Sequence, residues 1–435
     1  MRLAFVTEAV PNPGTSGGDA VSWAIVKQMR DSGHEVRPCC CLVNRWGRER
    51  PEAIERHVAA LAGLNVQVEL LHLPDSNPRD EPRPGGRRSR WHRAARLLRD
   101  LVHPMLPNLY APVAASVALA PEIQHILERD HPQAILAFDT GTVAALQHVR
   151  VAPRMAIPGD PPHLAHRYRR RLGGSADGTS PSALAGLLRR ALARRVPGLI
   201  VRMLRHYESV GMFGAQHAEW LRTGGIDCLY LCPPVVDTVG TQWQALRAAA
   251  SPRKRPKILI LGNLVGTASL AGLGAFAEIS LPALESRLGP DGFELHLVGR
   301  GTLPPGILRK LARPAVHLRG YVEDAAPEFL SADVFVSATP YPVGVRTRIA
   351  EAFSFGCCVV THPYSALGLP ELAHEQNVLL AEEGDEMAEA IVCALRDAGL
   401  RRRLGEQARR TYEENFHPRV AAARIVRVLE RLAHE

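Results

Sequence analysis

Two arginines and a glutamate in the last quarter of the chain have the spacing of a phosphate- and hydroxyl-binding site. Arg346, Arg348 and Glu351 lie in a segment, 346–355, that reads as a short helix ended by Gly356. Guanidinium groups match phosphate oxygens well, and the free N–H groups of a helix N-terminus attract negative charge. A carboxylate about one turn further on can accept hydrogen bonds from paired ribose hydroxyls. The spacing suits a nucleoside diphosphate, and it suits equally a surface helix with solvated arginines and a structural glutamate.

The neighbouring segments must position these side chains. Residues 332–337 read as a buried strand, and residues 357–361 form a second apolar, β-branched run. Between the first strand and the helix, Pro340, Pro342 and Gly344 predict a loop whose backbone can approach a ligand. The sequence therefore predicts a strand–loop–helix–strand unit.

This unit resembles the donor-site signature of family 4 glycosyltransferases. The resemblance rests on Gly344 to Ala352, a glycine four residues on, and the apolar strand that follows. It implies that Glu351 holds the ribose of a nucleotide sugar, that Arg346 and Arg348 hold its diphosphate, and that Gly344 and Val345 lie against the donor. The family usually has another glutamate eight residues before Glu351, where this chain has Val343. That departure resembles a subgroup with Gly-Val-Arg before the helix, and it leaves one contact to the leaving group or sugar unassigned.

Other donor contacts are predicted at the ends of strands in the same half of the chain. The strand over 258–264 ends in a turn at Gly262 and Asn263, whose backbone groups can approach the donor. Residues 316–324 read as a further strand, followed by a helix over 325–330. The family resemblance implies that backbone groups around Val322 hold the nucleotide base.

The beginning of the chain reads as a strand at 3–6, a glycine-containing loop, a helix and a strand at 36–43. Gly17 and Gly18 allow the backbone to approach a ligand at the start of the helix, although a tight turn explains them equally well. The pattern resembles the opening of the same family, where this loop lies across the cleft from the donor. Asp19 is accordingly placed on the acceptor side.

Asp139 follows a buried strand at 134–138, and polar residues at the carboxyl ends of parallel strands face the ligand crevice. We therefore consider Asp139 a candidate for contact with the acceptor, and capping of a helix is an equally good explanation. Family members often have a histidine near this place, so no catalytic role is transferred to Asp139.

Repeated strand–helix units predict an α/β fold with doubly wound sheets. Their order resembles the GT-B fold, in which two Rossmann-like domains face each other across a cleft. We expect an acceptor-side domain over 1–237, a nucleotide-sugar-binding domain over 238–415, and a final helix over 416–435 that packs back on the first domain.

Composition and charge restrict the class of protein. The hydrophobic content of 46% and the charged content of 22% are ordinary for a globular protein, and the chain opens on a short strand rather than a signal peptide. The eight cysteines include adjacent residues within strands, which are poor disulfide partners, so reduced core thiols and a cytoplasmic location are predicted. No recognised module indicates nucleic-acid binding.

The excess positive charge lies almost entirely in the first half of the chain. Residues 1–237 contain 30 Lys and Arg against 22 Asp and Glu, a net of +8 out of the total of +9. Within them, residues 87–102 read as an amphipathic helix with an arginine-rich polar face. We favour packing of its apolar face on its own domain; the alternative is binding to an anionic membrane, which would make the protein peripheral at the inner face.

Together these features and the family resemblance predict a glycosyltransferase that moves a sugar from a UDP- or GDP-sugar to a glycan, a lipid-linked acceptor or a small molecule. The resemblance implies that transfer proceeds with retention. The nucleotide sugar is a substrate, so no cofactor is predicted. Because the sequence has no Asp-x-Asp motif, we assign no metal-ligating residues and expect no metal dependence. A nucleotide-sugar epimerase on the same fold and a non-catalytic sugar- or partner-binding protein remain alternatives, the second supported mildly by Val343.

Overall fold

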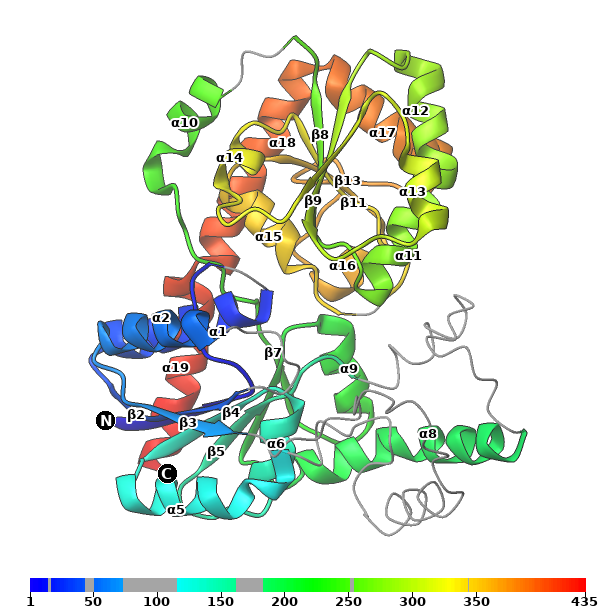
Figure 1. Cartoon of the computed structure of the whole chain (residues 1–435). Coiled ribbons are helices and arrows are strands. Elements are labelled where there is room, and N and C mark those ends of the chain that lie inside the picture. Colours follow the sequence, from blue (N-terminus) through cyan, green and yellow to red (C-terminus); the bar gives the residue numbers. More distant parts are fainter. Residues whose placement is uncertain (15–16, 44–50, 73–115, 162–182, 251–253, 343) are drawn as a thin grey trace.

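The chain forms two parallel β-sheets, each covered by helices on both faces (Figure 1). The structure is a computed structural model and describes residues 1–14, 17–43, 51–72, 116–161, 183–250, 254–342 and 344–435. The first sheet has seven strands in the order β3-β2-β1-β4-β5-β6-β7. Its strands are β1 (Arg2–Thr7), β2 (Glu35–Val43), β3 (Val68–His72), β4 (Ala134–Phe138), β5 (Arg154–Ile157), β6 (Ser209–Met212) and β7 (Cys228–Tyr230).

The second sheet has six strands in the order β10-β9-β8-β11-β12-β13. Its strands are β8 (Lys257–Asn263), β9 (Glu294–Arg300), β10 (Val316–Gly320), β11 (Val334–Ser337), β12 (Cys358–Thr361) and β13 (Leu379–Leu380). In each sheet the strand order reverses next to a central strand, β1 or β8. Ligands of doubly wound sheets bind beyond the carboxyl ends of the strands at such points.

Because helices cover both faces of the first sheet, its strands carry apolar side chains on both faces. Ala4 and Val6 lie in the core on one face, and Leu3 and Phe5 lie in the core on the other. The helices of this half are α1 (Gly17–Asp31), α2 (Pro51–Ala62), α5 (Ala120–Asp130), α6 (Thr140–Leu146), α8 (Ala183–Leu204) and α9 (Ala215–Thr223).

The second half repeats this arrangement with its own pair of cores. Its α-helices are α10 (Trp243–Ala250), α11 (Thr267–Ala275), α12 (Leu281–Leu288), α13 (Pro305–Leu311), α14 (Ala326–Leu330), α15 (Thr347–Ser354), α16 (Tyr364–Gly368), α17 (Asp385–Arg396) and α18 (Ala398–Thr411). The short 3₁₀-helix η2 (Gly240–Gln242) and the π-helices η3 (Phe276–Ser280) and η4 (Tyr412–Phe416) complete it.

The last helix, α19 (Pro418–His434), returns to the first sheet (Figure 1). Ile425, Val426 and Leu429 recur at helical spacing and are buried in the same core as Val21 and Ile25 of α1. Burial of one such side chain stabilises a protein by roughly 1.5–3 kcal/mol, so this apolar stripe fixes the end of the chain to the first domain.

Two sequence expectations need correction. The strand predicted over 316–324 ends at Gly320, whose φ of +68° breaks the extended conformation. Seven of the eight cysteines are buried and free, as expected, but Cys393 on α17 is exposed.

The amphipathic segment 87–102 lies outside the described residues. None of the helices in the described part of the chain combines the length and the apolar character that a membrane span needs.

Candidate active site

The helix α15 presents its N-terminus at the carboxyl ends of the second sheet, directly after the loop that follows β11. Arg346 is the N-cap residue, and its carbonyl accepts from the Ile349 N–H at 2.8 Å. The apolar side chains Ile349 and Phe353 are buried in the core below, which leaves Arg348 and Glu351 on the opposite, partly exposed side of the helix. The local fold thus follows from an amphipathic helix that begins at Thr347, one residue later than predicted.

Arg348 and Glu351 form an ion pair one turn apart, in which Arg348 Nη1 donates to Glu351 Oε2. Their side chains keep 28% and 24% of their exposure, so both remain accessible. Gly262 lies beside this pair, because a Cβ added to it would stand 3.9 Å from Arg348 Cγ. Asn263 is the exposed last residue of β8. The structure therefore brings together four of the predicted donor-site residues.

Val322 lies further along the same edge of the sheet, in the loop after β10. It is half-buried and packs against the core cluster that contains Ile349 and Phe353. Beside it, the Arg300 guanidinium lies over the Tyr321 ring, 4.1 Å from the ring centroid.

The loop 344–347 touches the first domain directly, and we call this contact the domain junction. A Cβ added to Gly344, whose φ is +76°, would stand 2.6 Å from Asp160 Oδ2. A Cβ added to Gly17 would stand 2.6 Å from Thr347 Oγ1, whereas one added to Gly18 would have no neighbour within 4 Å. Of the two predicted glycines, Gly17 makes the close approach to the start of α15.

Arg346, Asp160 and His217 form a cluster of titratable side chains at the junction. His217 on α9 is 1% exposed, and its Nδ1 lies 3.7 Å from Asp160 Oδ1. Burial, together with the smaller effect of the positive charge of Arg346, lowers the pKa of His217 to about 4. His217 is therefore neutral at pH 7, and its contact with Asp160 is not an ion pair.

Asp160 and Arg346 each oppose the pKa shift that burial causes in the other. Loss of solvent around the Asp160 carboxyl raises its pKa, although 49% of the side chain stays exposed, and Arg346 opposes that shift. Loss of solvent likewise lowers the pKa of Arg346, and Asp160 opposes it. The two carry opposite charges at neutral pH and link the domains electrostatically.

Two polar atoms of α9 are buried here without a hydrogen-bond partner in the described part of the chain. They are Gln216 Oε1 and His217 Nδ1. Burying such an atom unsatisfied costs about 1–3 kcal/mol, so their position beside the loop 344–347 favours a polar ligand.

Asp139 lies at the carboxyl end of β4, with a φ of +77°. It is the N-cap residue of α6, but its side chain does not cap the helix; instead Thr7 Oγ1 donates to Asp139 Oδ2 at 3.5 Å. Glu8 follows β1, the neighbouring strand, and a Cβ added to Gly141 would meet Glu8 Oε1. Two carboxylates therefore stand at adjacent strand ends of the first sheet.

Asp19 is half-buried in the first turn of α1, where its carbonyl accepts from Ser22 Oγ at 2.8 Å. Sequence reasoning missed Glu8, Asp160 and His217. The rule that selected Asp139, a polar residue after a parallel strand, would also have selected Glu8 and Asp160. His217 lies on a helix with no distinguishing pattern.

The comparisons with known proteins agree on the architecture. Residues 255–397 match the model of a family described as glycosyl transferases group 1. No curated protein matches the chain.

Similar solved structures cover nearly the whole chain at low identity. Sucrose-phosphate synthase from Thermosynechococcus elongatus has a TM-score of 0.67 at 13% identity, with 99% of each chain covered. A glycosyltransferase from Rickettsia africae has a TM-score of 0.62 at 12% identity, covering 99% of this chain and 98% of that one. Anabaena Alr3699/HepE in complex with UDP-glucose has a TM-score of 0.61 at 13% identity, covering 99% and 100%. Two parallel Rossmann-like sheets and these neighbours show that the chain has the GT-B fold.

Proposed function

We propose that the protein is a glycosyltransferase that uses a nucleotide-sugar donor. The observation that carries this proposal is the group formed by Arg346, Arg348 and Glu351 at the N-terminus of α15, beside Gly262 and against the first domain. The family match over 255–397 covers this group, and solved structures with the same fold hold UDP or UDP-glucose.

The step that needs stabilisation is departure of the nucleoside diphosphate from the sugar. Negative charge then grows on the phosphate oxygens, and preorganised donors placed at that position lower the barrier. Arg346, Arg348 and the first N–H groups of α15 supply such donors. Glu351 Oε2 is engaged by Arg348, and we assign Glu351 Oε1 to a ribose hydroxyl of the donor.

Further donor contacts come from backbone groups. Gly262 and Asn263 are assigned to the phosphates or sugar, Gly344 and Val345 to the diphosphate side, and the segment around Val322 to the base. The base is that of a UDP- or GDP-sugar.

The acceptor side is assigned to the first domain. Asp139 and Asp19, together with Glu8 and Asp160, present carboxylates that accept hydrogen bonds from sugar hydroxyls, as a glycan or lipid-linked acceptor requires. Transfer is proposed to proceed with retention. It is also proposed to need no metal ion, since two guanidinium groups neutralise the leaving diphosphate. Unchanged initial rates in EDTA would support the metal-independent part.

The test is a panel of nucleotide sugars followed by thermal shift and by product analysis. A donor at 100 times its dissociation constant should stabilise the protein by about 2.7 kcal/mol. With the best donor, Arg346→Ala and Arg348→Ala should each lower turnover by about 10²- to 10³-fold, as loss of one charge-stabilising donor does. Arg309→Ala, an exposed arginine on α13, is the matched control and should leave turnover unchanged.

The same experiment separates the alternatives. A free epimerised donor without acceptor product would indicate an epimerase, and donor binding without hydrolysis or transfer would indicate a binding protein. Full turnover in Arg346→Ala and Arg348→Ala would refute the assignment of the site.

We also propose that the protein is cytoplasmic, with binding to the inner face of an anionic membrane through the basic first half of the chain as the alternative to packing of segment 87–102 on its own domain. Flotation of the full chain with liposomes should then depend on anionic lipid and weaken with salt. Replacing Arg87, Arg88, Arg90 and Arg93 with glutamine should reduce it; equal flotation with neutral liposomes would contradict the proposal.

A further inference from the structure

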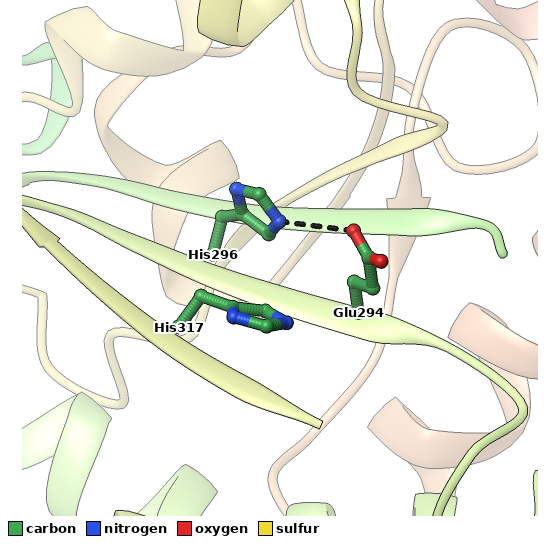
Figure 2. Close-up of side chains that lie close together, drawn as sticks. All are labelled: Glu294, His296 and His317. Carbon is green, nitrogen blue, oxygen red and sulfur yellow. Dashed lines mark hydrogen bonds and ion pairs between the residues drawn. The ribbon is translucent and has the colours of Figure 1, made fainter. Parts of the chain in front are cut away.

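Three side chains that can bind a metal ion converge on the second sheet, away from the candidate active site. Glu294 and His296 lie two residues apart on β9, so both point to the same face of the strand. His317 is paired with His296 in the parallel register of β10 and β9. One ligand atom from each of the three residues lies within 4.8 Å of the other two. Figure 2 shows the three side chains close together on neighbouring strands.

The contacts of His296 resemble those of a metal-ligating histidine. Its Nε2 lies 3.2 Å from Glu294 Oε2, and its ring centroid is 5.0 Å from that of His317. Its other nitrogen, Nδ1, is buried, has no hydrogen-bond partner in the described part of the chain, and lies 3.9 Å from Glu328 Oε2. Ligating histidines usually direct their second nitrogen at a carboxylate, which fixes the ring and its tautomer.

Contacts within the protein hold the Glu328 carboxylate beside His296 without a metal ion. Lys257 Nζ donates to its carboxylate, and Arg319 Nε lies 3.9 Å from the other oxygen. The carboxylate is thereby anchored beside His296: Lys257 pairs with Oε2, the oxygen that faces His296 Nδ1, and Arg319 lies by Oε1.

We propose that Glu294, His296 and His317 bind one divalent transition-metal ion, with Zn²⁺ as the representative of the class. Two imidazoles and one carboxylate are the ligand set of borderline metals, whereas Mg²⁺ and Ca²⁺ prefer oxygen alone. Ligand bonds of about 2.0–2.2 Å require the three side chains to draw closer than 4.8 Å. His317 is exposed on the edge strand and can rotate to do so.

The site does not belong to the transfer chemistry. Glu294 is the first residue of β9 and His317 the second of β10, so they lie at the amino ends of strands. The donor-site residue Gly262 pairs with Gly299 near the carboxyl ends. A metal ion here links the edge strand β10 to β9 and acts on stability.

The test uses the full chain after removal of metal with a chelator. Zn²⁺ alone should bind at one ion per chain in a calorimetric titration and raise the melting temperature, and Co²⁺ in its place should give the visible absorption of a nitrogen- and oxygen-ligated ion. His317→Ala and Glu294→Gln should each weaken Zn²⁺ binding at least tenfold and abolish the thermal shift. His125→Ala, an exposed histidine on α5, is the control and should behave like the wild type.

Melting of each variant in chelator shows that it is folded before metal is added. The proposal is overturned if the wild type binds no Zn²⁺ at micromolar concentrations. It is equally overturned if His317→Ala and Glu294→Gln both bind Zn²⁺ as tightly as the wild type, because the ion would then sit elsewhere.

Discussion

At the scale of single residues, His217 is the group whose protonation most directly reports the domain junction. It is 1% exposed, and burial lowers its pKa to about 4. In the unfolded chain a histidine has a pKa of about 6.5. Between these values the unfolded chain binds a proton that the folded protein does not, so stability falls as the pH is lowered through this range.

Replacing His217 with glutamine should therefore flatten the dependence of stability on pH. The free energy of unfolding of the wild type should lose roughly 3 kcal/mol more than that of His217→Gln between pH 7 and pH 4. Urea unfolding at several pH values measures this difference. His125→Gln, at an exposed position, should keep the wild-type slope; a wild-type slope in His217→Gln as well would contradict the assigned pKa.

The residues of the site divide into those that a local pattern can predict and those that it cannot. The spacing of Arg346, Arg348 and Glu351 could be read from the sequence because one amphipathic helix sets it, and these residues run from the N-cap of α15 into the helix. Asp160 and His217 lie 57 residues apart in the sequence and meet only because the chain runs from β5 through α8 to α9. No spacing within one element encodes that meeting.

At the scale of elements, the strands buried on both faces were the easiest to predict. The strand expected at 134–138 coincides with β4, and that at 36–43 differs from β2 by one residue. The edge strand β3 is only partly buried and β13 has two residues, so neither gives a strong apolar run. Element ends also depend on backbone angles, as the early end of β10 at Gly320 illustrates.

The close approach of α1 to α15 gives a prediction at this scale. Gly17→Ala places a methyl group 2.6 Å from Thr347 Oγ1, so either the Thr347 side chain must rotate at the start of α15 or the two helix N-termini must separate. Gly18→Ala adds the same group where no atom lies within 4 Å and is the matched control. We expect Gly17→Ala to weaken donor binding about tenfold, a change of roughly 1.4 kcal/mol, and Gly18→Ala to leave it unchanged.

A second substitution tests whether the clash is the cause. Thr347→Ala removes the hydroxyl that the new methyl group would meet, so the double variant should recover most of the lost affinity relative to Thr347→Ala alone. Donor titration by calorimetry on the four proteins completes the cycle. If Gly17→Ala lowers donor affinity by the same factor in the wild type and in Thr347→Ala, the contact with the Thr347 hydroxyl is not the cause, and the change in the backbone at residue 17 is.

At the scale of the whole molecule, the two sheets are joined by the segment after β7 and by the return of the chain through η4 into α19 (Figure 1). Both connections meet at Arg409 of α18, whose side chain is 5% exposed. Its guanidinium pairs with Asp237 Oδ2 at 2.6 Å and with Glu413 Oε1 at 2.7 Å, and it also donates to the Ser354 carbonyl at the end of α15. One buried cation thus holds the linker, the donor-site helix and the crossover together.

Asp237→Asn should destabilise the protein by about 3 kcal/mol, because it leaves a buried arginine without its closest counter-charge. Asp227→Asn, at an exposed position, should change stability by about 0.5 kcal/mol or less.

Burial raises the pKa of Asp237, but the hydrogen bonds from Arg409 and from the Gly240 N–H outweigh burial and lower it overall. Its contribution is therefore complete above the ordinary pKa of an aspartate and is lost progressively as the pH falls from there through the lowered pKa of the folded state. Urea unfolding should show the difference between Asp237→Asn and the wild type at pH 7 and a clearly smaller one at about pH 3, below the ordinary pKa of an aspartate. An equal difference at both would mean that the charge of Asp237 does not hold the joint.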